Sequence, residues 1–281
     1  MNNYQVIVCD LDGTLLPKSQ IISQKTIDYF HKLQSLDKHI VIATGRSVTG
    51  LRDIVNQVCI KDKRSFLVTC NGQSILDFRN NNFYEGERVS QKDSLDLVTL
   101  AKKHHLIIYI DNDVNVYKTA KYLGIVHGLD FFIKYFKRAK WILQQVKDTS
   151  KATSIKDHID KDIRKLCFVG SRSYLERFVT NVKEIYGDKF NCLMVSNNWL
   201  EILMPSNSKG KAIELISKEL NIPLDQFICF GDGENDIEML ENAGLGVAMG
   251  NALDSVKEAS DDVTLTNEED GVYHYLYKIF K

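Results

Sequence analysis

The sequence lacks the cysteine pairs and long apolar runs that mark zinc-binding, redox and membrane proteins. Its six cysteines are scattered, and no two are separated by only two residues, so a Cys-x-x-Cys site is not expected. Cys9, Cys167 and Cys229 stand inside apolar runs and are predicted to be buried, reduced thiols. No apolar run approaches the roughly 20 residues that a membrane-spanning helix needs.

A strong charge of one sign is also missing, because 36 basic and 37 acidic residues leave a formal net charge of −1. Such a chain has no overall field that would attract nucleic acid or anionic lipid, so we expect neither nucleic acid nor membrane as a partner. The N-terminus has no basic start followed by a long apolar stretch, so no signal peptide is expected. The sequence is typical of a cytoplasmic protein, a monomer or a homodimer.

What is present is a regular alternation of strand-like and helix-like segments. Continuous apolar runs end near Cys9, Thr44 and Cys70, and between the first two Ile27, Phe30 and Leu33 recur at helical spacing. The same alternation returns in the last 78 residues, 204–281. Apolar strands separated by amphipathic helices predict an α/β fold, with a doubly wound parallel sheet covered on both faces.

The middle of the chain departs from this alternation. We therefore predict two domains, a core formed by residues 1–83 and 204–281 and an inserted α+β cap domain formed by residues 84–203. Within the insertion a helix is predicted for 94–103, and the aromatic and basic segment 131–141 is predicted to be a helix. Apart from this helix, we predict no secondary structure for residues 122–158, because their pattern fits neither a strand nor a helix clearly.

Polar side chains follow the predicted core strands at the points where those strands end. The stretch VIVCDLDGT places two acids directly after the first strand. Because the carboxyl ends of parallel strands meet at one edge of a sheet, groups from three strand ends and one helix start should converge. The residues expected there are Asp10, Asp12, Thr44, Gly45, Lys209, Asp232, Asn235 and Asp236. Arg46 follows Thr44 and Gly45 in the stretch ATGR, and we expect it to form a structural ion pair near this edge.

Clustered carboxylates with a hydroxyl and a lysine are the groups that phosphoryl transfer requires. Carboxylate oxygens bind Mg²⁺, and a carboxylate can attack phosphorus to form an aspartyl-phosphate. A second acid must protonate the leaving alkoxide and later deprotonate water. A lysine, a hydroxyl and backbone N–H groups stabilise the charge on the transferred phosphoryl group. Gly13 would let the backbone turn tightly beside the anion.

Four motifs in order resemble those of the haloacid dehalogenase (HAD) superfamily: DLDGTLL, ATGR, SKGKA and GDGENDIEML. The stretches TCNGQSI and AGLGVAMGNALDSVKEASDDVTLTNEEDGV are similar to the Cof-type hydrolases of that superfamily. The resemblance covers both core segments, whereas the insertion matches only in position and length. It implies an HAD-like, Rossmannoid core and a Mg²⁺-dependent phosphatase of small phosphorylated metabolites such as sugar phosphates.

The resemblance also implies a role for each residue at this edge. Asp10 would be the nucleophile and a metal ligand, and Asp12 the general acid and base, with its backbone carbonyl on the metal. Asp232 would be the third protein ligand, and Asp236 would hold a metal-bound water or brace the loop. The phosphate would be bound by Thr44, Gly45, Lys209, Asn235 and the backbone of Leu11.

Two other functions use similar residues and stay open. A phosphomutase would return the phosphoryl group to a second hydroxyl, and a non-catalytic phospho-acceptor or phosphosugar sensor would bind without turnover. A dinucleotide site is not expected, because GLGVAMG lacks the G-x-G-x-x-G spacing. Calcium is not expected at DNDVNV, because Val116 stands where an EF-hand loop needs glycine.

Overall fold

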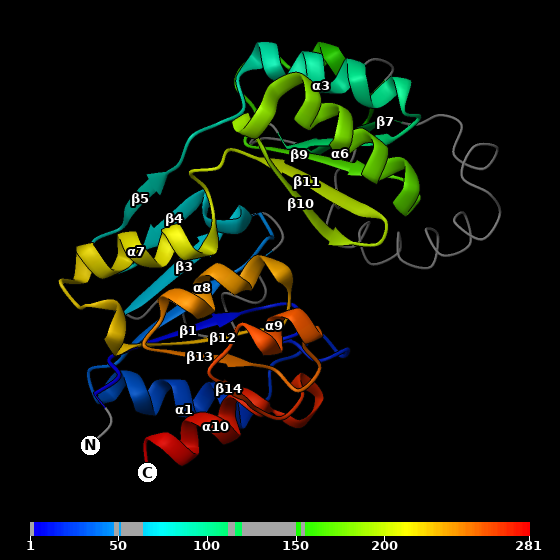
Figure 1. The fold of residues 1–281 in the computed structure, drawn as a ribbon. Helices are drawn as coiled ribbons and strands as arrows, with labels where there is room; N and C mark the ends of the chain where they lie inside the picture. The colour runs from blue at the N-terminus through cyan, green and yellow to red at the C-terminus, as the bar shows by residue number, and fades with distance from the viewer. Residues whose placement is uncertain (1–2, 48–50, 52–63, 112–115, 120–149, 153–154) are drawn as a thin grey trace. The chain divides into compact units, whose positions relative to one another are not determined.

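The computed structural model divides into two compact units, Met1–Gly86 with Asn207–Lys281 and Glu87–Ser206. Figure 1 shows the elements of each unit. The residues described are 3–47, 51, 64–111, 116–119, 150–152 and 155–281. The predicted helix at 131–141 and most of the DNDVNV stretch lie outside them. No helix among the described residues is long and apolar enough to cross a membrane.

The first unit contains one large sheet, with strands β1 (Val6–Asp10), β2 (His39–Ala43), β3 (Ser65–Thr69), β4 (Ser74–Asp77), β5 (Asn82–Glu85), β12 (Phe227–Gly231), β13 (Leu245–Ala248) and β14 (Asp262–Val263). Among the described residues, their order is β14-β13-β12-β1-β2-β3-β4-β5. Strand β4 pairs antiparallel with both β3 and β5 at one edge, and the other neighbours pair parallel. From β1 the chain builds β2 and β3 on one side, whereas β12 to β14 lie on the other. The boundary between β1 and β12 is therefore a topological switch point.

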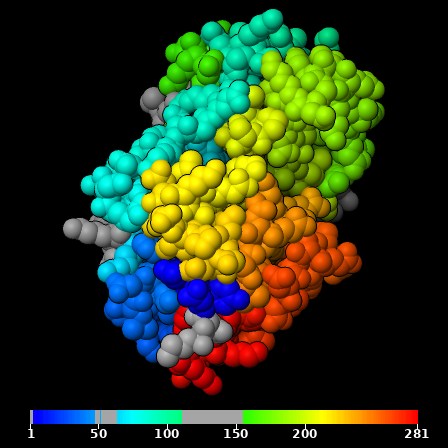
Figure 2. Space-filling view, turned by 60° about the vertical axis from the view of Figure 1, so that its left-hand side comes forward, coloured from blue at the N-terminus to red at the C-terminus, as the bar shows by residue number. Residues whose placement is uncertain are grey.

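Helices cover both faces of this sheet, as the sequence pattern predicted. They are α1 (Gln24–Ser35), α7 (Lys209–Leu220), α8 (Ile237–Asn242), α9 (Asp254–Glu258) and α10 (Gly271–Ile279). In Figure 1, α7 and α8 lie on one face, and α1 and α10 lie on the other. Figure 2 shows α7, in yellow, at the surface of this unit. Because both faces are covered, every residue of β1 and of β12 is buried.

Local signals fix where the two longest helices of this unit begin. The Ser23 side chain accepts a hydrogen bond from the Thr26 backbone N–H, and α1 then buries the predicted apolar stripe that includes Phe30 and Leu33. The Ser208 side chain accepts in the same way from the Lys211 N–H at the start of α7. A serine before the first turn satisfies a backbone donor that the helix itself leaves unpaired. Ser208 is therefore the N-cap of α7, and Lys209 is the first residue of the helix.

The structure confirms that the three cysteines predicted to be buried thiols are buried and form no disulfide. Cys9 in β1 and Cys229 in β12 are buried free thiols, and so is Cys167 in the second unit. Burial raises the pKa of Cys9 and of Cys229 well above the ordinary value, and a thiol kept protonated is a poor nucleophile. These cysteines therefore contribute to packing and not to chemistry.

The second unit packs two helices on one face of its own sheet. The helices are α3 (Gln91–Lys103) and α6 (Arg172–Tyr186), and Phe178 of α6 lies 4.7 Å from Phe168 between ring centroids. The strands are β6 (Ile107–Asp111), β7 (Val116–Thr119), β8 (Ser150–Ala152), β9 (Lys165–Val169), β10 (Asn191–Ser196) and β11 (Trp199–Leu203), in the order β10-β11-β9-β6-β7-β8. All described pairs except β7–β8 are antiparallel. Helix α3 begins three residues before the predicted 94–103 because the Ser90 side chain accepts from the Asp93 N–H.

The burial of His39 at the start of β2 makes the stability of the first unit depend on pH. Burial, assisted by the positive charges of Arg79 and Arg64, lowers the pKa of His39 below its ordinary value of 6.5. The unfolded chain therefore binds this proton more readily, so the free energy of unfolding falls as the pH drops below about 6.5. His39→Gln should lose less stability than the wild type in urea unfolding between about pH 8 and about pH 5.5. An equal pH dependence in the two proteins would contradict this role.

Candidate active site

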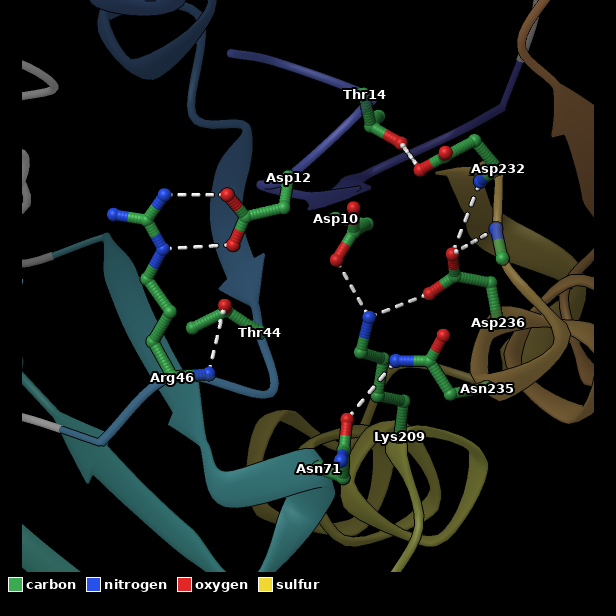
Figure 3. A network of polar contacts seen from close by, with 11 residues as sticks. Asp10, Asp12, Thr14, Thr44, Arg46, Asn71, Lys209, Asp232, Asn235 and Asp236 are labelled. Atoms are coloured by element: carbon green, nitrogen blue, oxygen red, sulfur yellow. Dashed lines mark hydrogen bonds and ion pairs between the residues drawn. The ribbon is translucent and has the colours of Figure 1, made fainter. Parts of the chain in front are cut away.

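The carboxyl ends of neighbouring strands bring the candidate residues together at the switch point. Asp10 is the last residue of β1, and it is in register with Ala43, the last residue of β2. Thr44 therefore follows on one side of Asp10, and Asp232 follows β12 on the other. Figure 3 shows Asp10 between these two groups. The sheet itself, and no single local motif, produces this convergence.

Three carboxylates form a compact cluster at this point. Asp10, Asp232 and Asp236 each offer an oxygen, and these oxygens all lie within 4.8 Å of one another. Asp10 and Asp236 are buried, and Asp232 is partly exposed. Like charges held this close repel one another, so the cluster favours a cation between its members. An all-oxygen set of ligands fits a hard divalent cation such as Mg²⁺.

A buried lysine connects two of these carboxylates. Lys209 Nζ lies 2.6 Å from Asp10 Oδ1 and 2.6 Å from Asp236 Oδ1, and its side chain is completely buried. Burial by itself lowers the pKa of Lys209, but the two carboxylates outweigh it and raise this pKa above the ordinary value. The lysine therefore stays charged. Removing one member of such a buried set costs about 3–5 kcal/mol, because the others lose their counter-charge.

Burial also raises the pKa of Asp10, and Lys209 opposes that shift while Asp236 and Asp232 add to it. With the ammonium group of Lys209 at 2.6 Å, we place a carboxylate and an ammonium in this contact. The remaining causes of the raised pKa are lost hydration and repulsion between carboxylates. A bound cation would counter both of these causes.

Both carboxylate oxygens of Asp236 accept hydrogen bonds from other groups of the protein. Its Oδ2 accepts hydrogen bonds of 3.0 Å from the backbone N–H groups of Asp232 and Gly233, and its Oδ1 accepts from Lys209. These bonds fix the loop that follows β12. Of the two roles considered for Asp236, this geometry favours bracing the loop.

Asp232 is oriented by a residue that the sequence analysis missed. Thr14 Oγ1 donates to Asp232 Oδ1 at 3.1 Å. Burial raises the pKa of Asp232 to about 6, the charge of Asp236 adds to this, and the bond from Thr14 opposes it. Gly13 adopts a φ of +88°, and a Cβ there would lie 2.2 Å from Asp232 Oδ2. Only glycine therefore fits between the first loop and this carboxylate.

The ion pair expected for Arg46 is present, and its partner is Asp12. Arg46 Nε donates to Asp12 Oδ2 at 2.7 Å, and Nη2 donates both to Asp12 Oδ1 and, at 2.8 Å, to Gln20 Oε1. Figure 3 shows the Asp12 carboxylate turned toward Arg46 and away from the cluster of Asp10, Asp232 and Asp236. Each oxygen of Asp12 accepts one of these bonds, and a carboxylate oxygen can accept a second, so both oxygens keep a site for a proton.

The candidate phosphate-binding residues lie beside the cluster. The buried Thr44 hydroxyl accepts from the Arg46 N–H at 3.1 Å and donates to no residue that the structure describes, so its proton is available. Asn235 Nδ2 donates to Asn71 Oδ1 at 3.0 Å. A Cβ on Gly45 would lie 3.1 Å from the same Asn71 oxygen. The carbonyl of buried Leu11 accepts from the Leu16 N–H at 2.8 Å.

Asn71 is the second site residue that the sequence analysis missed. Its backbone and that of Cys70 are left-handed, with φ of 55° and 51°, and their N–H groups donate to the carbonyls of Thr44 and Arg46. This strained turn thus fixes the backbone of the ATGR loop. The signal was present in the sequence, because Asn71 follows a third strand and precedes glycine, a pair typical of left-handed turns. Thr14 lies inside the motif DLDGTLL, but the motif does not indicate that its partner is Asp232.

Carboxylates grouped at the switch point of a doubly wound sheet define an α/β enzyme that acts beyond the carboxyl ends of its strands. Residues 7–276 match the haloacid dehalogenase-like hydrolase family, and the chain belongs to that family. This assignment covers nearly the whole sequence and includes both units of the structure.

Proteins similar along the whole chain carry names that agree with this family. Phosphatase YwpJ of Bacillus subtilis is 27% identical over 287 residues, which cover 97% of this chain and 98% of that protein. The HMP-PP phosphatase of Yersinia pestis is 27% identical over 277 residues, which cover 98% of this chain and 94% of that protein. A haloacid dehalogenase-like hydrolase from Bacteroides thetaiotaomicron has a similar structure, with a TM-score of 0.83, 25% identity and coverage of 98% and 99%.

The raised pKa of Asp232 gives a stability test of the cluster. Because its folded pKa of about 6 exceeds the ordinary 3.8, the favourable contribution of this group exists at low pH and is lost as the pH rises through about 6. In chelator at about pH 8, Asp232→Asn should therefore raise the free energy of unfolding, by roughly 1–3 kcal/mol. Chemical denaturation measures this, with the exposed Asp28→Asn as a control. A loss of stability would show that the carboxylates do not repel one another as described.

Proposed function

We propose that this chain is a Mg²⁺-dependent phosphatase that hydrolyses phosphomonoesters of small metabolites, such as sugar phosphates, through an aspartyl-phosphate on Asp10. The observation that carries the proposal is the buried Asp10 carboxylate at the switch point, 2.6 Å from a buried lysine and clustered with two further carboxylates. The names of the relatives, a phosphatase and an HMP-PP phosphatase, support the reaction class.

The donor set supports a site for Mg²⁺. Oxygens of Asp10 and Asp232 would hold the ion together with the backbone carbonyl of Asp12, and Asp236 would support them by fixing the Asp232 loop. When bound, the ion would supply positive charge that neutralises the phosphate oxygens and allows an anionic carboxylate to approach them.

The chain's own residues would perform the two chemical steps. Lys209 holds one oxygen of Asp10 and keeps the carboxylate charged. In the first step an Asp10 oxygen bonds to phosphorus and the bond to the leaving alkoxide breaks, with Asp12 giving that alkoxide its proton. In the second step Asp12 takes a proton from water, and the water oxygen replaces Asp10 on phosphorus. The bonds from Arg46 hold the Asp12 carboxylate in place beside the reacting groups.

The phosphate oxygens would be bound by donors that the fold already aims at this edge. The Thr44 hydroxyl has a proton to give, and Lys209 adds positive charge. The amide of Asn235 and the backbone N–H groups of Leu11 and Gly45 would complete the set. Donors fixed before the reaction stabilise developing charge without reorganising. We assign the catalytic core to residues 1–83 and 204–281, and selection of the leaving group to the inserted cap, residues 84–203.

Asp10→Asn tests the nucleophile. Because the amide cannot form the acyl phosphate, the variant should release almost no p-nitrophenol from p-nitrophenyl phosphate, while circular dichroism shows a native fold. With the wild type, EDTA should abolish release and added Mg²⁺ should restore it.

A free-phosphate assay separates the alternatives. Free phosphate from a panel of phosphorylated metabolites indicates a phosphatase, whereas a phosphomutase would keep phosphate on its substrate. A sensor or phospho-acceptor protein would show no sustained turnover. Full turnover by Asp10→Asn would exclude Asp10 as the attacking group, and a rate indifferent to EDTA would exclude the metal.

Asp12→Asn separates the acid and base role from the metal role. The asparagine keeps the backbone carbonyl but carries no exchangeable acid, so turnover should fall about 10²–10⁴-fold while Mg²⁺ affinity stays near that of the wild type. Calorimetric titration with MgCl₂ measures the affinity. Arg46→Gln is the matched control, because it breaks the same ion pair but leaves the Asp12 carboxylate in place. A collapse of Mg²⁺ affinity in Asp12→Asn alone would refute the backbone contact.

A further inference from the structure

Two asparagines from the C-terminal part of the chain fasten the loop that follows Asp12. Asn251 Nδ2 donates to the Gly13 carbonyl at 2.8 Å, and Asn267 Nδ2 donates to the Leu16 carbonyl at 2.7 Å. The two are also bonded to each other, because the Asn267 N–H donates to Asn251 Oδ1 at 2.9 Å. We call Asn251 and Asn267 the asparagine brace.

The brace belongs to a segment that is itself fixed. Asn267 begins a short turn, Asn267–Glu269, in which Thr266 Oγ1 donates to Glu269 Oε2 at 2.6 Å. Asn251 follows β13, and two residues later the Leu253 N–H donates to the Asp232 carbonyl at 3.2 Å. One stretch of chain therefore contacts both the loop after Asp12 and the loop that carries Asp232.

Three contacts lead from the brace to the carboxylate cluster. The Gly13 carbonyl that Asn251 holds belongs to the same peptide unit as the Thr14 N–H, and Thr14 Oγ1 donates to Asp232 Oδ1 at 3.1 Å. The Gly13 backbone also lies directly against the Asp232 carboxylate. Glycine leaves its peptide free to rotate unless another group holds it. A rotation here would move Thr14 and release Asp232.

We propose that Asn251 and Asn267 are positioning residues that hold the Gly13–Thr14 peptide and thereby orient Asp232 toward the cation. The inference deepens the proposed function and rests on its assignment of Asp232 as a metal ligand. Hydrogen-bond partners of metal ligands tune metal affinity although they never touch the ion. Neither asparagine contacts substrate in this scheme, so substrate affinity should not depend on them.

Asn251→Asp is the sharpest variant, because it keeps the shape and the oxygen that accepts from Asn267 but replaces the amide donor. Calorimetric titration with MgCl₂ should show a loss of affinity of about tenfold, the usual size for such a partner. Hydrogen exchange of the peptide Leu11–Lys18 should accelerate, while KM for p-nitrophenyl phosphate at saturating Mg²⁺ stays unchanged. Asn198→Asp is the matched control, since Asn198 Nδ2 also donates to a glycine carbonyl, that of Gly170, at 3.1 Å.

A double variant tests whether the effect travels through Thr14. If it does, Asn251→Asp combined with Thr14→Val should weaken Mg²⁺ binding by less than the product of the two single effects. Wild-type Mg²⁺ affinity in Asn251→Asp, or a loss equal to that in Asn198→Asp, would overturn the proposal. A wild type that binds Mg²⁺ but hydrolyses nothing would refute the proposed function and leave the calorimetric test intact. A wild type that binds no Mg²⁺ would overturn both.

Discussion

One buried ammonium group stands among three clustered carboxylates, and the rest of the site depends on that imbalance of charge. Lys209 offsets part of the repulsion, since it pairs with Asp10 and Asp236, each at 2.6 Å. The pKa of Asp232 is raised like that of Asp10, and Asp232 has no lysine at hydrogen-bond distance among the described contacts but accepts from the Thr14 hydroxyl. A site built in this way stores electrostatic energy that a bound cation releases. The oxygens of this cluster are close enough together to hold one metal ion.

The fold maintains this arrangement with backbone groups more than with side chains. Asp236 accepts two N–H bonds from its own loop, and the turn at Cys70 and Asn71 donates two N–H bonds to the ATGR loop. The left-handed backbone of that turn costs free energy, which the surrounding sheet must supply. Such fixed dipoles do not reorganise during a reaction, and this is why a rigid parallel sheet suits phosphoryl transfer.

The ion pair of Asp12 with Arg46 fixes the carboxylate beside the cluster. The guanidinium group engages both oxygens of the carboxylate and also contacts Gln20. In the proposed cycle, Asp12 carries the proton, while Asp10 and Lys209 lie in the buried interior.

The strands, the main helices of the core and the acids at the strand ends could all be predicted from the amino-acid pattern. Apolar periodicity and serine caps are local signals, and a carboxylate after a buried strand is conspicuous in any context. The partners of those acids, such as Lys209 between Asp10 and Asp236 or Thr14 on Asp232, are known only from the folded structure. Those contacts join residues as many as 218 positions apart. Their distances depend on how strands pair and loops pack, and no local pattern encodes such a distance.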